Sequence, residues 1–100
     1  MAVELLVGLQ VNNADLYAEY RRLMTPILHQ HHGDFGCDFI VQKSLKPADT
    51  AINRVFTIYF ASQQLMDSFF SHPDYVAIRQ KYFEPAVSAS HILATYQRPD

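Results

Sequence analysis

The sequence predicts an α+β domain in which two helices cover one face of a four-stranded antiparallel sheet. Apolar residues alternate in four segments and recur at helical spacing in two others, in the order strand, helix, strand, strand, helix, strand. Because crossovers between parallel strands are right-handed and the connections are short, this order favours the split-βαβ sandwich. Residues 1–100 form one domain, because two hydrophobic cores would not fit in 100 residues.

The strands are predicted at residues 3–11, 35–44, 52–60 and 90–96. The first alternates between an apolar face, which includes Leu5 and Val7, and a mixed face. The third is rich in β-branched and aromatic residues, which favour a pleated surface. A turn is predicted at residues 46–49, next to the third strand.

The helices are predicted from the residues at their ends. Asn12 and Asn13 precede the first helix and Ser62 precedes the second, and short side-chain oxygens at such positions accept hydrogen bonds from the free amides of the first turn. Pro26 is expected to kink the first helix rather than end it. Gly33 is expected to end that helix in the left-handed conformation.

A break is predicted inside the second helical segment. Ser71 and Asp74 fit a capping box, and Pro73 suits a first helical turn. The helical pattern then continues until Pro85.

The strands carry apolar residues on both faces, with Phe56 and Ile58 opposite Val55 and Tyr59. Helices can cover only one face, so the other face needs a partner, and a second copy of the same sheet is the simplest one. The aromatic content of 13% also exceeds what so small a monomer easily buries. We therefore expect ferredoxin-like sandwiches that pair as a homodimer into a dimeric α/β barrel.

Composition excludes several other functions. The formal net charge of -2 gives no electrostatic footprint for nucleic acid. No run of 18 apolar residues is present, so no membrane span is expected. The first residues lack the features of a signal peptide, and Cys37 has no second cysteine with which to pair. These absences favour a cytoplasmic protein.

Several segments resemble one family of small proteins. They are residues 16–20 (LYAEY), 26–28 (PIL), 32–33 (HG), 53–62 (NRVFTIYFAS) and 69–75 (FFSHPDY). Together they resemble the DUF1330 family of the dimeric α/β-barrel superfamily, over nearly the whole chain. The resemblance implies that fold, usually with a pocket between helices and sheet. The wider superfamily includes cofactor-free monooxygenases, haem-degrading enzymes and lactone isomerases.

The chain departs from the family pattern at two places. The usual Gly-Gly at the first turn is His32-Gly33, and the acidic residue before the last aromatic residue of the third strand is Tyr59. If the carboxylate of the family has a chemical role, this chain lacks it at that position.

Arg54 is the first candidate site residue, because it is a charged residue in an otherwise apolar strand. Such a residue must reach solvent, form an ion pair or bind an anion. Its planar fork suits a carboxylate or phosphate, and the position matches an arginine of the family. The alternatives are a structural ion pair with an acid such as Glu4 or Asp34, and an edge position with the charge in water.

Other candidates are a histidine and several tyrosines. His91, in the last strand, has the chemistry of a general base or of a haem ligand, and the more common alternative for such a residue is a satisfied histidine in an interface. Tyr59 is a further catalytic candidate, and Tyr20 and Tyr75 are candidate contacts for a flat ligand. The full set of tyrosines weighed for such a pocket is Tyr17, Tyr20, Tyr59, Tyr75 and Tyr82, and core packing is the alternative for all of them.

No metal site is expected from the histidines near the end of the first helix. His29 and His32 share a helix face, but no acid lies in register as a third ligand, and histidines here also suit the helix dipole. No cofactor motif is present either, and Cys37 lacks an activating base.

Two functional classes remain open. One is a cofactor-independent enzyme, monooxygenase- or isomerase-like, acting on a small aromatic or carboxylated metabolite. The other is a non-catalytic homodimer that binds a small ligand or has a structural role. A pocket that holds Arg54 together with His91 or a tyrosine favours the first class, and a filled interior favours the second.

Overall fold

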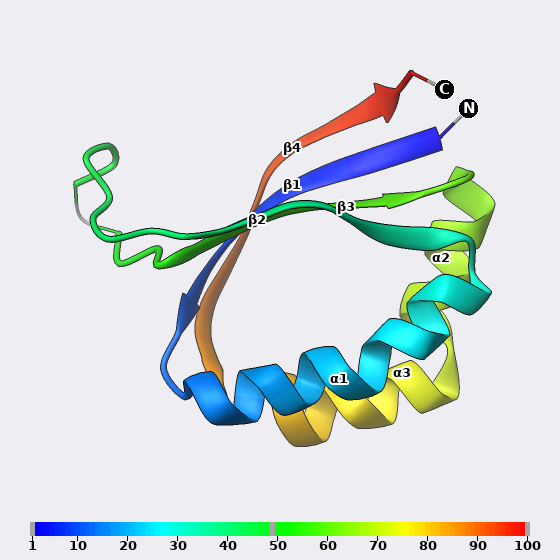
Figure 1. The fold of residues 1–100 in the computed structure, drawn as a ribbon, viewed down its shortest axis with the longest axis horizontal. Coiled ribbons are helices and arrows are strands. Elements are labelled where there is room, and N and C mark those ends of the chain that lie inside the picture. Colours follow the sequence, from blue (N-terminus) through cyan, green and yellow to red (C-terminus); the bar gives the residue numbers. More distant parts are fainter. Residues whose placement is uncertain (1, 49, 100) are drawn as a thin grey trace.

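The computed structural model describes residues 2–48 and 50–99 and confirms the predicted order of elements (Figure 1). All four strands differ in their bounds from the prediction, and the second helical segment is divided into three parts. The elements are β1 (Ala2–Val11), α1 (Ala14–Gln30), β2 (Gly33–Ile40), β3 (Arg54–Phe60), α2 (Gln63–Ser71), α3 (Pro73–Ile78), the π-helical turn η1 (Arg79–Phe83) and β4 (Val87–Arg98).

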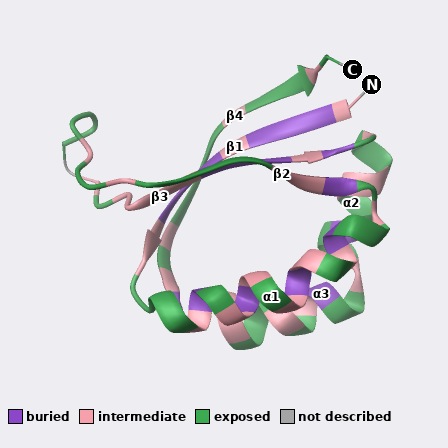
Figure 2. Ribbon diagram, viewed as in Figure 1, coloured by how far each residue is buried: buried purple, intermediate pink, exposed green. Residues whose placement is uncertain are grey.

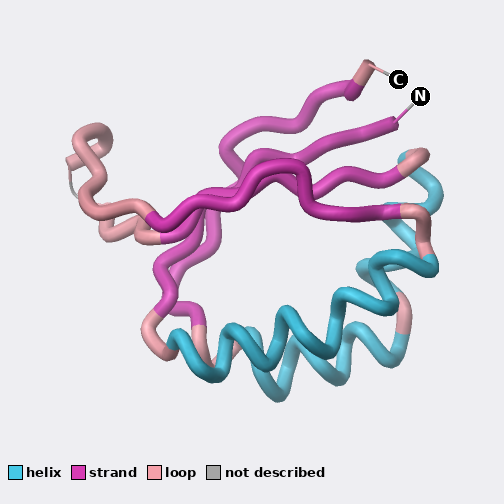
Figure 3. Tube along the Cα trace, in the orientation of Figure 1, coloured by secondary structure: helices cyan, strands magenta, loops and turns pink. Residues whose placement is uncertain are grey.

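The four strands form one antiparallel sheet in the order β2-β3-β1-β4. All helices lie on the same side of this sheet, as the tube in Figure 3 shows. The central strand β1 sets the two faces, because Leu5 pairs with Ile58 on one side and with Thr95 on the other. The predicted fold class is therefore confirmed.

Strand β2 is shorter than predicted and β4 is longer. The chain leaves the sheet after Ile40, and residues 41–48 and 50–53 form a loop that projects away from the helices (Figure 3). Its predicted turn at residues 46–49 includes Asp49, which lies outside the described residues. At the other end of the chain β4 pairs with β1 along ten registered positions, from Ala2 to Val11, so the long central strand extends its neighbour.

The predicted caps are observed at both main helices. The side chain of Asn13 accepts from the Leu16 amide at 3.0 Å, and that of Ser62 accepts from the Leu65 amide at 3.2 Å. Pro26 lies inside α1, which continues to Gln30. These local signals worked because each needs only neighbouring residues.

Two predictions about helix ends were wrong. The left-handed residue after α1 is His32, with φ 54°, and Gly33 already belongs to β2. The cap of α3 is His72, whose Nδ1 accepts from the Asp74 amide at 3.1 Å, while Ser71 ends α2. The left-handed residue thus lies one position before the predicted Gly33, and the cap lies one position after the predicted Ser71.

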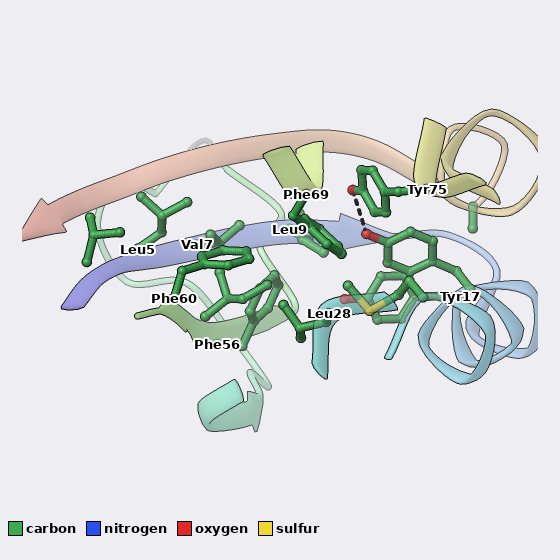
Figure 4. Close-up of a cluster of buried hydrophobic side chains, with 14 residues drawn as sticks. Leu5, Val7, Leu9, Tyr17, Leu28, Phe56, Phe60, Phe69 and Tyr75 are labelled. Atoms are coloured by element: carbon green, nitrogen blue, oxygen red, sulfur yellow. Dashed lines mark hydrogen bonds between the residues drawn. The ribbon is translucent and has the colours of Figure 1, made fainter. Parts of the chain in front are cut away.

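The core lies between β1, β3 and the helices (Figure 2). Figure 4 shows its side chains converging from the sheet and from α1 and α3. The largest fully buried side chains are Tyr17, Leu9, Met24, Leu28, Phe60 and Phe69. On the far face of the sheet the only buried polar residues described are Glu4 and Thr57.

Gly33 is required by close packing rather than by its backbone angle. A Cβ at this position would lie 2.6 Å from Leu28 Cδ1 and 2.8 Å from the Tyr59 carbonyl oxygen. A Cβ at Gly8 would lie 3.1 Å from a flexible Ile52 side chain, which can move.

We expect Gly33→Ala to lower the free energy of unfolding by about 2 kcal/mol, the usual cost of overpacking. Gly8→Ala is the matched control and should lose much less. Urea denaturation of the two variants measures this difference. Equal losses would show that contact with the Tyr59 backbone does not determine residue 33.

Candidate functional site

A cavity of about 510 Å³ lies between the helices and the sheet. Its floor is mostly apolar and comes from all four strands, mainly β1, β3 and β4, and its roof comes from α1 and from the segment α2–η1. The lining residues that carry polar groups are Tyr17, Tyr20, Arg21, Gln63, Tyr75, Arg79, Ser90 and Thr95. The cavity thus combines an apolar body with a few polar contacts, which is the usual composition of a small-molecule site.

Aromatic rings hold the roof of this cavity in place. Tyr17 and Tyr20 lie three residues apart on α1, with ring centroids 5.6 Å apart. The turn η1 places the ring centroid of Phe83 5.0 Å from that of Tyr20. The ring centroids of Tyr75 of α3 and Phe69 of α2 lie 4.3 Å apart. These rigid side chains fix the distance between the helices.

The hydroxyl groups of Tyr20 and Tyr75 form a buried hydrogen bond of 2.9 Å, drawn as the dashed line in Figure 4. Burial raises the pKa of Tyr20 well above its ordinary value, and it also raises the pKa of Tyr75. Both hydroxyls are therefore neutral near pH 7 and act as donors rather than bases. Their mutual bond uses one of their two protons, so one O–H remains for an acceptor in the cavity.

A charged cluster lies beside the cavity. Arg54 donates to both carboxylate oxygens of Asp38, from Nε and Nη2, each at 2.8 Å. Arg21 donates to the same oxygens at 3.1 and 3.5 Å and to the Tyr17 hydroxyl at 2.8 Å. The hydrogen bonds from Arg54 lower the pKa of Asp38, with a further contribution from the charge of Arg21 and against the effect of burial.

A β-bulge explains why Asp38 faces the helices. Phe35 pairs with Ile58, but Asp38 pairs with Phe56, so residues 36–37 contain one extra residue. Without it Asp38 would pair with Val55 and point to the opposite face of the sheet. The bulge therefore places the carboxylate next to α1 and Arg54.

The structure brings only some of the predicted site residues together. Tyr20 and Tyr75 line the cavity and contact each other, and Tyr17 lines it as well. Arg54 lies outside the lining, bound to Asp38 rather than to Glu4 or Asp34. Tyr82 packs against the core without lining the cavity.

Tyr59 and His91 lie on the sheet face opposite the helices. His91 is exposed, pairs with Gly8 and borders a shallower hollow of about 300 Å³. Tyr59 pairs with Glu4 on β1, so a carboxylate lies directly beside the position where the resemblance led us to expect one. The guanidinium of Arg98 lies 3.7 Å from the centre of the Tyr59 ring.

The histidines near the end of α1 are dispersed. His29 pairs with Asp34 at 3.3 Å, and the His31 ring lies 5.5 Å from that of His72. Among the described residues no group of three or more metal-binding side chains comes together. Cys37 is exposed on β2. No helix in the described part of the chain is long and apolar enough to cross a membrane.

Sequence reasoning missed Arg21, Asp38 and Arg79. Arg21 is half-buried whereas the next residue, Arg22, is exposed, so the position of Arg21 in the cavity wall depends on the rotation of α1 against the sheet. Asp38 depends on the bulge. The aromatic residues around position 21 were the one available signal, because guanidinium groups stack on such rings.

The register and the one-sided helices define this chain as a ferredoxin-like α+β sandwich. A protein of unknown function from Rhodopseudomonas palustris has the same fold, with a TM-score of 0.85 and 18% identity, over 99% of this chain and 83% of that chain. A dimeric ferredoxin-like protein of unknown function from Jannaschia sp. CCS1 has a TM-score of 0.71 and 11% identity, over 98% of this chain and 100% of that chain.

SnoaB, a cofactor-independent oxygenase from Streptomyces nogalater, is also similar, with a TM-score of 0.64 and 11% identity, over 99% of this chain and 94% of that chain. At such identities the likeness establishes the fold alone. No family model matches the chain, and neither does any curated protein.

We expect Arg54→Met to lower the free energy of unfolding by about 1 kcal/mol at pH 7, because the ion pair is partly exposed and Arg21 still contacts Asp38. The folded-state pKa of Asp38 is lowered, so the ion pair stabilises the fold above the ordinary carboxyl pKa of about 3.9 and is lost as the pH falls below it. The difference between variant and wild type should therefore shrink below about pH 4.

Urea denaturation between pH 2.5 and pH 7 measures this dependence. Arg22→Met, which removes an exposed pair with Glu19 on the same helix, is the control. A loss of several kcal/mol for Arg54→Met would instead indicate that Asp38 is a buried charge left without a partner.

Proposed function

We propose that this chain binds a small, flat, aromatic or carboxylated metabolite in the cavity between its helices and its sheet. The observation that supports this most directly is the cavity itself, because its volume of about 510 Å³ suits a ligand of two or three fused rings. Tyr20 and Tyr75 are the proposed ligand contacts, with their free O–H directed to a carbonyl or phenolic oxygen of the ligand. The resemblance to the DUF1330 family and a cytoplasmic location stay predictions from the sequence.

The enzymatic form of this proposal is a cofactor-independent reaction. Neutral tyrosine hydroxyls can stabilise an oxygen that gains negative charge, as in the enolate of an isomerisation or an oxygenation. The SnoaB neighbour is described as a cofactor-independent oxygenase, so this fold accommodates such chemistry. Arg54, Tyr59 and His91 lie outside this cavity, and a catalytic role for any of them would need another site or a partner chain.

One observation favours binding without catalysis. Within residues 2–48 and 50–99, the cavity lining contains no Asp, Glu, His, Lys or Cys side chain. A reaction that removes a proton from the substrate would therefore find no carboxylate, imidazole, amine or thiol in the lining to act as the general base. A non-catalytic ligand-binding homodimer is thus the second candidate.

We expect 2-naphthamide and 2-naphthoate to bind in this cavity, and Ile92→Trp to weaken both by about tenfold or more, equal to about 1.4 kcal/mol. Ile92 is exposed at the cavity rim, so a larger ring there obstructs the cavity at little cost to the fold. Ile40→Trp adds the same ring at an exposed residue outside the lining and should have no effect. Isothermal titration calorimetry measures the affinities. If neither probe binds the wild type, the proposed function is wrong.

We also propose that the protein is a homodimer in which a second copy covers the sheet face opposite the helices. Apolar side chains remain exposed on that face, among them Phe39 and Leu93, and half-buried Leu6 lies at its centre. The Jannaschia neighbour is described as dimeric. A dry contact over this face would bury the apolar surface that the helices leave uncovered.

Sedimentation at about 10 μM, a concentration at which a dimer of nanomolar Kd persists, should give twice the chain mass of 11.5 kDa. Leu6→Glu should yield monomers, because it places a charge in the centre of the proposed interface. Leu45→Glu, at an exposed residue of the loop, should remain dimeric. A folded wild-type monomer at this concentration contradicts the proposed dimer.

A further inference from the structure

The cluster beside the cavity carries an unbalanced positive charge. Two guanidinium groups, those of Arg21 and Arg54, share the single carboxylate of Asp38. The side chains are only 15%, 25% and 33% exposed, respectively, and no other acid among the described residues pairs with either arginine. A charge held partly out of water is unfavourable without a counter-ion. The cluster is therefore suited to receive an anion.

The two arginines are not equivalent. Arg54 makes two bonds of 2.8 Å that engage both oxygens of Asp38, whereas those from Arg21 measure 3.1 and 3.5 Å. Arg21 lines the cavity and Arg54 does not. A guanidinium has five N–H groups, and Arg21 uses three of them within the protein. It therefore keeps two donors for a ligand.

Aromatic rings hold the Arg21 guanidinium at this position. Its central carbon lies 3.9 Å from the centre of the Phe35 ring and 4.7 Å from that of Phe56. Such stacking fixes the plane of the guanidinium and thus the directions of its two remaining N–H groups, one on Nη1 and one on Nη2, either of which can donate to a carboxylate oxygen. The same two rings line the cavity, so an aromatic ligand there lies close to the free donors.

We propose that Arg21 receives the carboxylate of an aromatic acid in the cavity, and that Arg54 is a positioning residue that engages Asp38 and so keeps Arg21 available. This inference rests on the proposed ligand-binding role of the cavity and narrows the ligand to aromatic carboxylates. Anion binding is thereby assigned to Arg21 on α1. The sequence had favoured Arg54 for this role, because it is a charged residue in an otherwise apolar strand.

The test compares 2-naphthoate with its uncharged isostere 2-naphthamide by calorimetry. The wild type should prefer the carboxylate by about tenfold or more, the contribution of a charge-assisted hydrogen bond. Arg21→Met should abolish this preference, and Arg21→Lys should retain part of it because the charge remains without the fork. Arg22→Met, one residue away on the exposed face of α1, should leave it unchanged.

Two further variants change the cluster charge in opposite directions. Asp38→Asn removes the negative charge of the cluster, which makes its net charge more positive, and should raise the preference for 2-naphthoate. Arg54→Met makes the cluster neutral and draws Arg21 toward Asp38, so it should lower the preference. General damage to the fold would weaken both probes alike and leave their ratio unchanged, and thermal unfolding of each variant checks for it.

The outcomes separate this inference from the proposed function. If both probes bind equally well, the cavity is a ligand site and the carboxylate receptor is refuted. If Arg79→Met abolishes the preference while Arg21→Met does not, the receptor is Arg79 and the assignment is overturned. If Asp38→Asn and Arg54→Met shift the ratio in the same direction, the shared-carboxylate argument fails.

Discussion

All helices of this chain pack on one face of its sheet, and the other main features of the structure follow from that arrangement. This sheet carries apolar residues on both faces, and its helices cover one of them. The covered face contains the core and the cavity, whereas the open face keeps apolar residues such as Leu93 in contact with solvent. The proposed dimer contact over the open face follows from this one-sided cover.

The cavity exists because the roof is built from rigid aromatic side chains. Ring contacts connect α1, α3 and η1, and they keep these helices from packing directly on the sheet. The rings belong to Tyr17, Tyr20, Tyr75 and Phe83. A ring has two side-chain torsions and cannot fold into a gap as methionine can. The space left below is mostly apolar, and four of the polar side chains at its wall bond in pairs, Tyr20 with Tyr75 and Arg21 with Tyr17.

Local features were predictable from the sequence, and features set by distant contacts were not. The caps Asn13 and Ser62 need only the next turn of chain. An ion pair of Arg54 was one of the possibilities that the sequence offered, but Asp38 was not named as its partner. One extra residue in the β2 bulge decides which face of the sheet Asp38 occupies, and the sequence does not reveal that bulge. Tyr20 and Tyr75, which the sequence offered as contacts for a flat ligand, both line the cavity, but the cavity itself depends on how all side-chain volumes fit together.

The exposed Cys37 gives this molecule a unique chemical handle. It is the single cysteine of the sequence and lies in the edge strand β2, within the bulge that orients Asp38. A maleimide fluorophore therefore attaches at one defined place without any change of sequence. Because that place is on the strand that carries the carboxylate, the emission of the dye reports on the sheet edge, whereas tyrosine fluorescence reports on the cavity roof.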